Sequence, residues 1–283
     1  MGKVPVVATI RDAYAFAFSH LGGIIGLIWI PMVLLTVAQF FTLLRYYNAM
    51  IDFVAGGSAA ALGPACLMLL GDVAAALLLY SMMFVAVVQL ALGNRPAGAI
   101  AHFAFGPPEW RMARALLAVA GAAMLLLLGL ALLLNLVMTA GKLPQESASV
   151  LLVFVLLGVG LVLAPRALLL LPAVSVNETV PVLRRAWALT EGNFLRLLAI
   201  LLALVVPVTA LMWAANAAIA GGVTLSGDDQ TKLLQTLMRG RQILPLACGV
   251  GFFVSPVLVG LVASASVSCW RTLTGERALD VTA

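Results

Sequence analysis

The chain has 283 residues, of which 64% are hydrophobic and 10% are charged, and its net charge is +5. A soluble domain carries about 25% charged residues, so this composition excludes an ordinary soluble protein and indicates a body largely surrounded by lipid. The basic residues lie at the edges of apolar stretches and form no clustered surface for nucleic acid. We therefore expect no nucleic-acid partner.

Six apolar stretches are long enough to cross a membrane as helices, since a span needs about 20 apolar residues. They cover residues 21–44, 66–92, 113–138, 150–174, 194–220 and 243–270. Leucine runs such as 125–128 do not alternate in polarity, as the strands of a membrane barrel would. The sequence predicts an all-α polytopic membrane protein with six transmembrane helices, in which residues 1–283 form a single membrane domain.

A unit of similar sequence occurs three times. The predicted break between its short and long helical parts falls near residues 13–20, 102–107 and 186–193. Each copy has a short amphipathic stretch, a tight break and two apolar stretches. This pattern predicts three parallel repeats at about residues 5–92, 96–174 and 180–271. Each repeat would be an interfacial amphipathic helix followed by a helical hairpin.

The first unit runs from Pro5 to Ser19, and Leu21 begins the first span. Four of its apolar residues recur at helical spacing and are predicted to face the membrane: Val6, Ile10, Tyr14 and Ala17. The second unit opens near Pro96 and breaks at residues 106–108, Gly-Pro-Pro, which is typical of a sharp start of a new helix. Glu109 would lie in the first turn of that helix, where a negative charge is favourable.

The third unit opens at Pro181, and its predicted membrane-facing stripe is Val180, Leu183, Trp187 and Thr190. Arg184 and Arg185 are predicted to face the lipid headgroups. Gly192 can end this helix and Asn193 can cap the next one. Farther along, residues 226–240 predict a second interfacial helix on the opposite membrane face, with Ser226 and Asp229 as a capping box.

Basic residues favour one orientation of these spans. With the N-terminus in the cytoplasm, ten Lys and Arg residues fall on the cytoplasmic side against five on the outer side. Cytoplasmic loops carry the excess of positive charge, so we expect both termini to be cytoplasmic.

Parts of the sequence resemble a known family. They are residues 171–174, Leu-Pro-Ala-Val, the later run 183–196, and residues 270–275 near the end of the chain. The family comprises bacterial integral-membrane proteins related to the membrane domain of glycerophosphoryl diester phosphodiesterases. The residues that carry the resemblance are Pro172, Glu178, Trp187, Thr190, Gly192, Asn193 and Arg271.

In that family the phosphodiesterase activity belongs to a separate soluble domain. The resemblance therefore implies a multi-pass protein of the bacterial inner membrane and carries over no catalytic residue. We expect no enzyme activity and no cofactor, since two isolated histidines, His20 and His102, are too few for a metal site.

Two charged residues fall inside spans, where a charge is costly and suggests function. Arg166 follows Pro165 in the fourth span and is either a ligand for an anion or lipid phosphate, or a structural residue paired with Glu178 or Glu191. Asp72 in the second span is either a proton or cation site, or a carboxylate that is hydrated or bonded to a neighbouring helix. We favour the structural interpretation of both.

Uncharged polar and small residues inside the spans predict helix packing. Four in-span amides are expected to join helices by hydrogen bonds rather than to line a cavity: Gln39, Gln89, Asn135 and Asn216. Small residues at four-residue spacing, such as Gly251 with Ser255 and Gly260 with Ser264, would allow close packing within the chain or in a homodimer. Cys66 and Cys248 either form a disulfide or, as we favour, fill apolar space.

Two functions follow as expectations. The first is a non-catalytic inner-membrane module that binds lipid or a hydrophobic ligand, or organises a partner. Membrane lipids, another membrane protein or a second copy of the chain would be its partners, and four arginines would hold anionic headgroups: Arg111, Arg114, Arg184 and Arg185. The alternative is a transporter or permease component for a small amphiphile or anion, with Arg166 and the in-span amides along its path.

Overall fold

The computed structural model describes residues 3–57, 59–94, 105–141, 145–175, 182–221 and 228–275. Within these ranges all regular secondary structure is helical. Six helices are long and apolar enough to cross a membrane. The prediction of an all-α fold with six helices of membrane-spanning length and apolarity is thereby confirmed.

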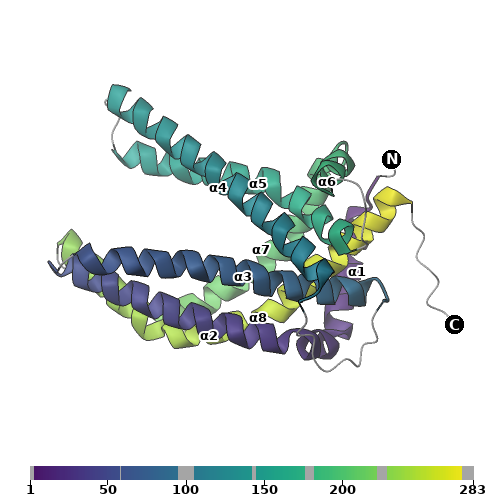
Figure 1. Ribbon diagram of the computed structural model, residues 1–283, viewed down its shortest axis with the longest axis horizontal. Helices are drawn as coiled ribbons and strands as arrows, with labels where there is room; N and C mark the ends of the chain where they lie inside the picture. The colour runs from purple at the N-terminus through teal and green to yellow at the C-terminus, as the bar shows by residue number, and fades with distance from the viewer. Residues whose placement is uncertain are drawn as a thin grey trace.

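The long helices follow one another as three hairpins (Figure 1). Their bounds are α2 Leu21–Val54 with α3 Leu62–Ala91, α4 Pro107–Gly141 with α5 Gln145–Ser175, and α7 Phe194–Ala220 with α8 Asp229–Thr274. A 3-10 turn, η1 Ala59–Ala61, precedes α3. Two short helices, α1 Val6–Ser19 and α6 Val182–Thr190, lie with the last turns of α8 at one end of the molecule. We call this the terminal end and the opposite one the hairpin end.

The elbows between short and long helices match the sequence prediction where they are described. A single residue, His20, separates α1 from α2. Gly192, with a φ of 78°, stands between α6 and α7 in a conformation that glycine adopts readily. At the start of α4 the backbone N–H of Gly106 donates to the side chain of Glu109 at 3.0 Å, as in a capping box. The stretch from Pro96 to His102, where the second interfacial helix was predicted, lies outside the described residues.

Helix α1 packs against the protein rather than facing lipid with its predicted stripe. Its fully buried residues are Thr9, Ala13 and Ala17, four residues apart on one face. Three residues of the predicted stripe pack partly against the core: Val6, Ile10 and Tyr14. The Tyr14 hydroxyl donates to the carbonyl of Ala203 in α7 at 3.2 Å. Small side chains let α1 approach α7 and α8 closely, which the apolar periodicity alone did not indicate.

Helix α8 is one continuous helix of 46 residues. The prediction of a separate interfacial helix over residues 226–240 was therefore wrong. Gly240 lies inside this helix and does not end it. Its missing side chain makes room for the ring of Tyr47, since an added Cβ would lie 2.8 Å from a ring atom. Close packing against α2 keeps the polar first part of α8 helical.

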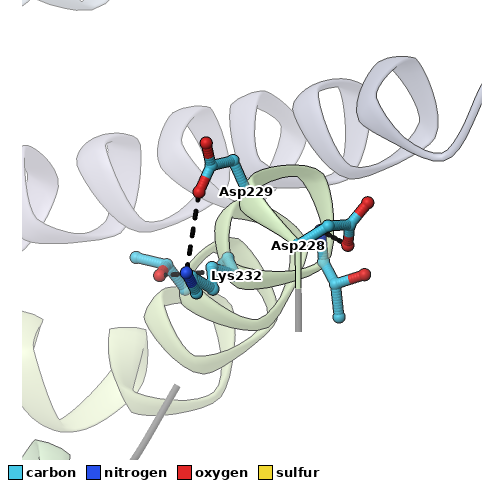
Figure 2. Close-up of polar contacts among 5 residues, drawn as sticks. Asp228, Asp229 and Lys232 are labelled. Carbon is cyan, nitrogen blue, oxygen red and sulfur yellow. Dashed lines mark hydrogen bonds and ion pairs between the residues drawn. The ribbon is translucent and has the colours of Figure 1, made fainter. Parts of the chain in front are cut away.

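The start of α8 is capped by Asp228 (Figure 2). Ser226, the predicted cap, lies outside the described residues. The Asp228 carboxylate accepts a hydrogen bond from the backbone N–H of Thr231 at 3.1 Å. Hydrogen bonds from the Thr231 side chain and backbone lower the pKa of Asp228 below its ordinary value. One turn in, Lys232 Nζ lies 3.6 Å from Asp229 Oδ1.

Two arginines of α8 bind the carbonyl ends of neighbouring helices. Toward the hairpin end Arg239 donates to the carbonyl of Ala220, the last residue of α7, at 2.6 Å. At the terminal end Arg271 donates to the carbonyl of Leu92, just past α3, at 3.1 Å. Unpaired carbonyls at a helix end favour a cation, so both contacts fasten α8 to its neighbours.

The core lies in the terminal half of the molecule. It is formed by residues 24–35 of α2, 83–90 of α3, 168–174 of α5 and 259–273 of α8, together with α1, α6 and the starts of α4 and α7. The outer halves of α4 and α5 expose large apolar side chains such as Leu125 and Phe154. The α4–α5 hairpin accordingly diverges from the other four long helices toward the hairpin end (Figure 1).

Candidate functional site

An apolar pocket of about 490 Å³ lies between α4, α5 and α6. Its walls on the long helices are Ala118, Val119 and Ala122 of α4 and Leu163 of α5. Helix α6 and the turn after it contribute Arg184, Trp187, Ala188 and Glu191. We call this cavity the α6 pocket. It combines an apolar interior with one cation and one anion.

The spacing of the α6 residues explains why they share the pocket. Positions 184, 187, 188 and 191 recur at the three- and four-residue intervals that place side chains on one helix face. The opposite face is formed by Ala186, Leu189 and Thr190, all of which are buried. Thr190 is 2% exposed and was predicted to share a lipid-facing stripe with Trp187. That prediction was wrong, since the two residues lie on different faces.

Arg166 lies behind the pocket wall. Its guanidinium carbon is 3.9 Å from the centroid of the Trp187 ring and 5.6 Å from that of Phe194. It also donates to the carbonyl of Val162, one turn earlier in α5. Of its two predicted partners, Glu178 lies outside the described residues, and no ion pair joins Arg166 to Glu191 in the described structure. Arg166 thus supports Trp187 through a cation–π contact, worth about 0.5–2 kcal/mol.

The four arginines predicted to hold headgroups do not act as one surface. Arg184 lines the α6 pocket, whereas the Arg185 guanidinium carbon lies 5.4 Å from the ring centroid of the buried Trp270. Arg185 therefore points into the bundle, contrary to the prediction. On α4, Arg114 is exposed and lies 6.0 Å from the ring of Trp110, and Arg111 is half-buried.

Most residues that carry the family resemblance are buried or hold helices together. Pro172 is buried within α5, and Arg271 fastens α8 to the end of α3. Asn193 is buried and accepts a hydrogen bond from the backbone N–H of Val4 at 3.3 Å. Its side chain thus holds the segment before α1, rather than the start of α7 as predicted. Trp187 is the member of this set that lines the α6 pocket.

The in-span polar residues lie apart from the pocket. Gln89 in α3 donates to the carbonyl of Ser175 in α5 at 3.3 Å, which confirms its predicted role in joining helices. Asn216 donates to Met212 in its own helix. Gln39 and Asp72 are half-buried, and one carboxylate oxygen of Asp72 is buried without a hydrogen-bond partner among the described residues. The side chain of Asn135 lies outside the described residues.

Cys66 and Cys248 are both free thiols, the first exposed and the second half-buried. No disulfide therefore joins these two cysteines in the described structure. Among the described residues no group of three or more His, Cys, Asp or Glu residues could hold a metal ion.

Two other pockets are more polar than the α6 pocket. One, of about 470 Å³, lies between α1, α3 and α8 and includes Asp12 and Arg271. The other, of about 400 Å³, lies toward the hairpin end and includes Arg45 and Asp52. The Arg271 side chain is already bonded to Leu92, and Asp12 lies 3.5 Å from Arg11. The α6 pocket therefore remains the leading candidate site.

Sequence reasoning placed Trp187 and Arg184 near a functional surface but missed the α4 and α5 walls. A usable signal was present: Ala118 and Ala122 lie four residues apart and are too small to fill the space beside a neighbouring helix.

Comparisons with protein-family models, with curated proteins and with solved structures give no match for this chain.

Proposed function

We propose that this chain is a non-catalytic membrane module that holds a lipid in the α6 pocket. The observation that carries the proposal is an apolar cavity on a membrane-spanning helix pair, with Arg184 beside it. A volume of about 490 Å³ lies in the range of small-molecule sites. Alkyl chains are the most abundant apolar ligands around a span, and a guanidinium binds phosphate well.

The position of α6 supports this proposal. Trp187 is half exposed, with an amphipathic indole of the kind enriched at membrane–water interfaces. Arg184, on the same helix face, can extend its charged head toward water while its stem stays against apolar atoms. A lipid could then place its headgroup at α6 and its chain between α4 and α5.

The transporter alternative has less support. It requires Arg166 to line a path through the bundle, whereas its guanidinium stacks on Trp187 and Phe194. An enzyme is also not proposed, because the pocket residues include no serine, cysteine or histidine among those described.

Filling the pocket tests the proposal. In Ala122→Trp the indole would occupy the space between α4 and α6, so we expect lipid retained by the purified protein to fall several-fold. Leu132→Trp is the matched control, because Leu132 lies on the same helix and is 64% exposed away from the pocket. Native mass spectrometry after extraction into nanodiscs measures the retained lipid. Equal retention by the two variants would contradict a lipid site in the α6 pocket.

We also infer that the three hairpins are parallel repeats in a bacterial inner membrane, with both termini in the cytoplasm. Each hairpin starts at the terminal end, and two of them follow a short helix and an elbow. The terminal end carries basic residues of α1, α4, α6 and α8, which the positive-inside rule assigns to the cytoplasm.

Thiol labelling tests this orientation in intact cells. In a cysteine-free background, Asp229→Cys at the exposed start of α8 should react with a membrane-impermeant maleimide. Lys3→Cys, at the terminal end, should react only after the cells are opened. The reverse pattern would invert the proposed topology.

A further inference from the structure

We infer that the α6 pocket selects a phospholipid whose headgroup carries both a phosphate and a primary amine. This inference rests on the proposed lipid site and specifies its ligand. The observation is that the pocket is lined by one cation and one anion, Arg184 and Glu191. Arg184 lies on α6, and Glu191 lies seven positions later, in the turn that follows this helix.

Both charges are available to a ligand. Within the described residues neither Arg184 nor Glu191 forms an ion pair, and both are exposed. Arg166, which lies over the ring of the pocket residue Trp187, is engaged with that ring. Both side chains line the same pocket, so one headgroup placed there could contact both Arg184 and Glu191.

The two charges define which headgroup fits. A guanidinium binds a phosphate through paired N–H groups, and a carboxylate accepts hydrogen bonds from a protonated amine. A lipid with a phosphate but no amine would satisfy Arg184 and bring its negative charge toward Glu191. A headgroup carrying both charges satisfies both residues at once.

A quaternary ammonium fits less well than a primary amine. It has no N–H to donate to Glu191, and its usual partner in proteins is the face of an aromatic ring. The pocket contains one such ring, Trp187, and Arg166 already lies over it at 3.9 Å from the centroid. The geometry therefore favours an ethanolamine-type or serine-type amine over choline. A serine headgroup also carries a carboxylate, which would bring a second negative charge of the lipid toward Glu191. Ethanolamine is the headgroup that best matches this pocket.

The test is competitive lipid retention. The protein is reconstituted with equal amounts of phosphatidylethanolamine, phosphatidylglycerol and phosphatidylcholine, and native mass spectrometry reads the retained lipid. We expect the wild-type protein to retain the ethanolamine lipid about fivefold over the other two, the order of effect expected from a partly exposed ion pair. Glu191→Gln should abolish this preference, and Glu191→Asp should keep most of it.

The controls separate this inference from the lipid site itself. Asp229→Asn removes an exposed carboxylate at the start of α8 and should leave the preference unchanged. Retention of all three lipids without preference by the wild-type protein would overturn the headgroup inference and leave the lipid site standing. Loss of preference in Asp229→Asn as well as in Glu191→Gln would also overturn it. Absence of any retained lipid in the wild-type protein would overturn the lipid site.

Discussion

Replacing Gly260 by leucine should destabilise the protein more than any other single change considered for α8. An added Cβ at this position would lie 2.8 Å from Cδ1 of Ile24 and 3.4 Å from Cβ of Ala17. Both neighbours are 0% exposed, so they have little space into which to move. Overpacking of a filled core costs about 1–3 kcal/mol, and a leucine extends well beyond its Cβ.

The measurement is thermal unfolding of the purified protein, together with the reactivity of Cys269. This thiol is 0% exposed and four residues from the end of the core segment, so it reports opening of the terminal half. Gly260→Leu should lower Tm and speed thiol labelling. Gly251→Leu is the matched control in the same helix, because an added Cβ there meets no atom within 4 Å. Equal shifts in the two variants would show that helix propensity, and not close packing, sets the effect.

Asn193→Ala should release the segment that precedes α1. The Val4 N–H donates to Asn193 Oδ1, and the Val4 carbonyl accepts from Arg196 at 3.4 Å. Val4 is 1% exposed, so removal of the acceptor leaves a buried donor unpaired. Such a loss costs about 1–3 kcal/mol of folding free energy. We expect its effect to be local to the region where α1 packs against α7.

Hydrogen exchange measures this release. In Asn193→Ala the amides of residues 6–19 should exchange faster, while those of α8 near Trp270 should keep their protection. Asn94→Ala is the control, since Asn94 is exposed just beyond α3. Unchanged exchange in α1 would mean that packing of Thr9, Ala13 and Ala17 alone holds this helix.

The span α7 was predicted with its observed bounds, 194–220, whereas α8 was not. The apolar run of α7 is bordered on both sides by glycines with positive φ, Gly192 and Gly221, so composition and backbone change together. In α8 the apolar run stops near residue 243, but the helix starts at Asp229. Apolarity marks a stretch that suits lipid surroundings, and it carries no information about a polar helical segment that packs on another helix.

Glycine is the residue whose role most depended on tertiary structure. In the sequence, Gly240 and Gly260 could each indicate either a helix break or a position of close packing. The structure assigns both to packing, against Tyr47 and against Ile24 with Ala17. The partners come from elements about 200 residues away in the chain, so no local pattern could identify them.

The same dependence on distant parts of the chain explains why the site was only partly predicted. The amphipathic pattern of α6 was recognised, but a short helix has two candidate apolar faces. Burial of Ala186 and Leu189 chose one, and this choice turned Trp187 toward α4 and α5. Arg185, next to Arg184 in sequence, was thereby directed toward Trp270 instead of the lipid.

The two arginine contacts of α8 fasten it to α7 at one level of the bundle and to the end of α3 at another. Arg239 is bonded to the carbonyl end of α7, and Arg271 is bonded just past the end of α3. These two residues lie 32 positions apart on one continuous helix, so α8 sets how far α3 and α7 can slide past each other along the membrane normal. A bilayer that became thicker or thinner would have to be met by tilting of the helices together or by breaking one of these two contacts.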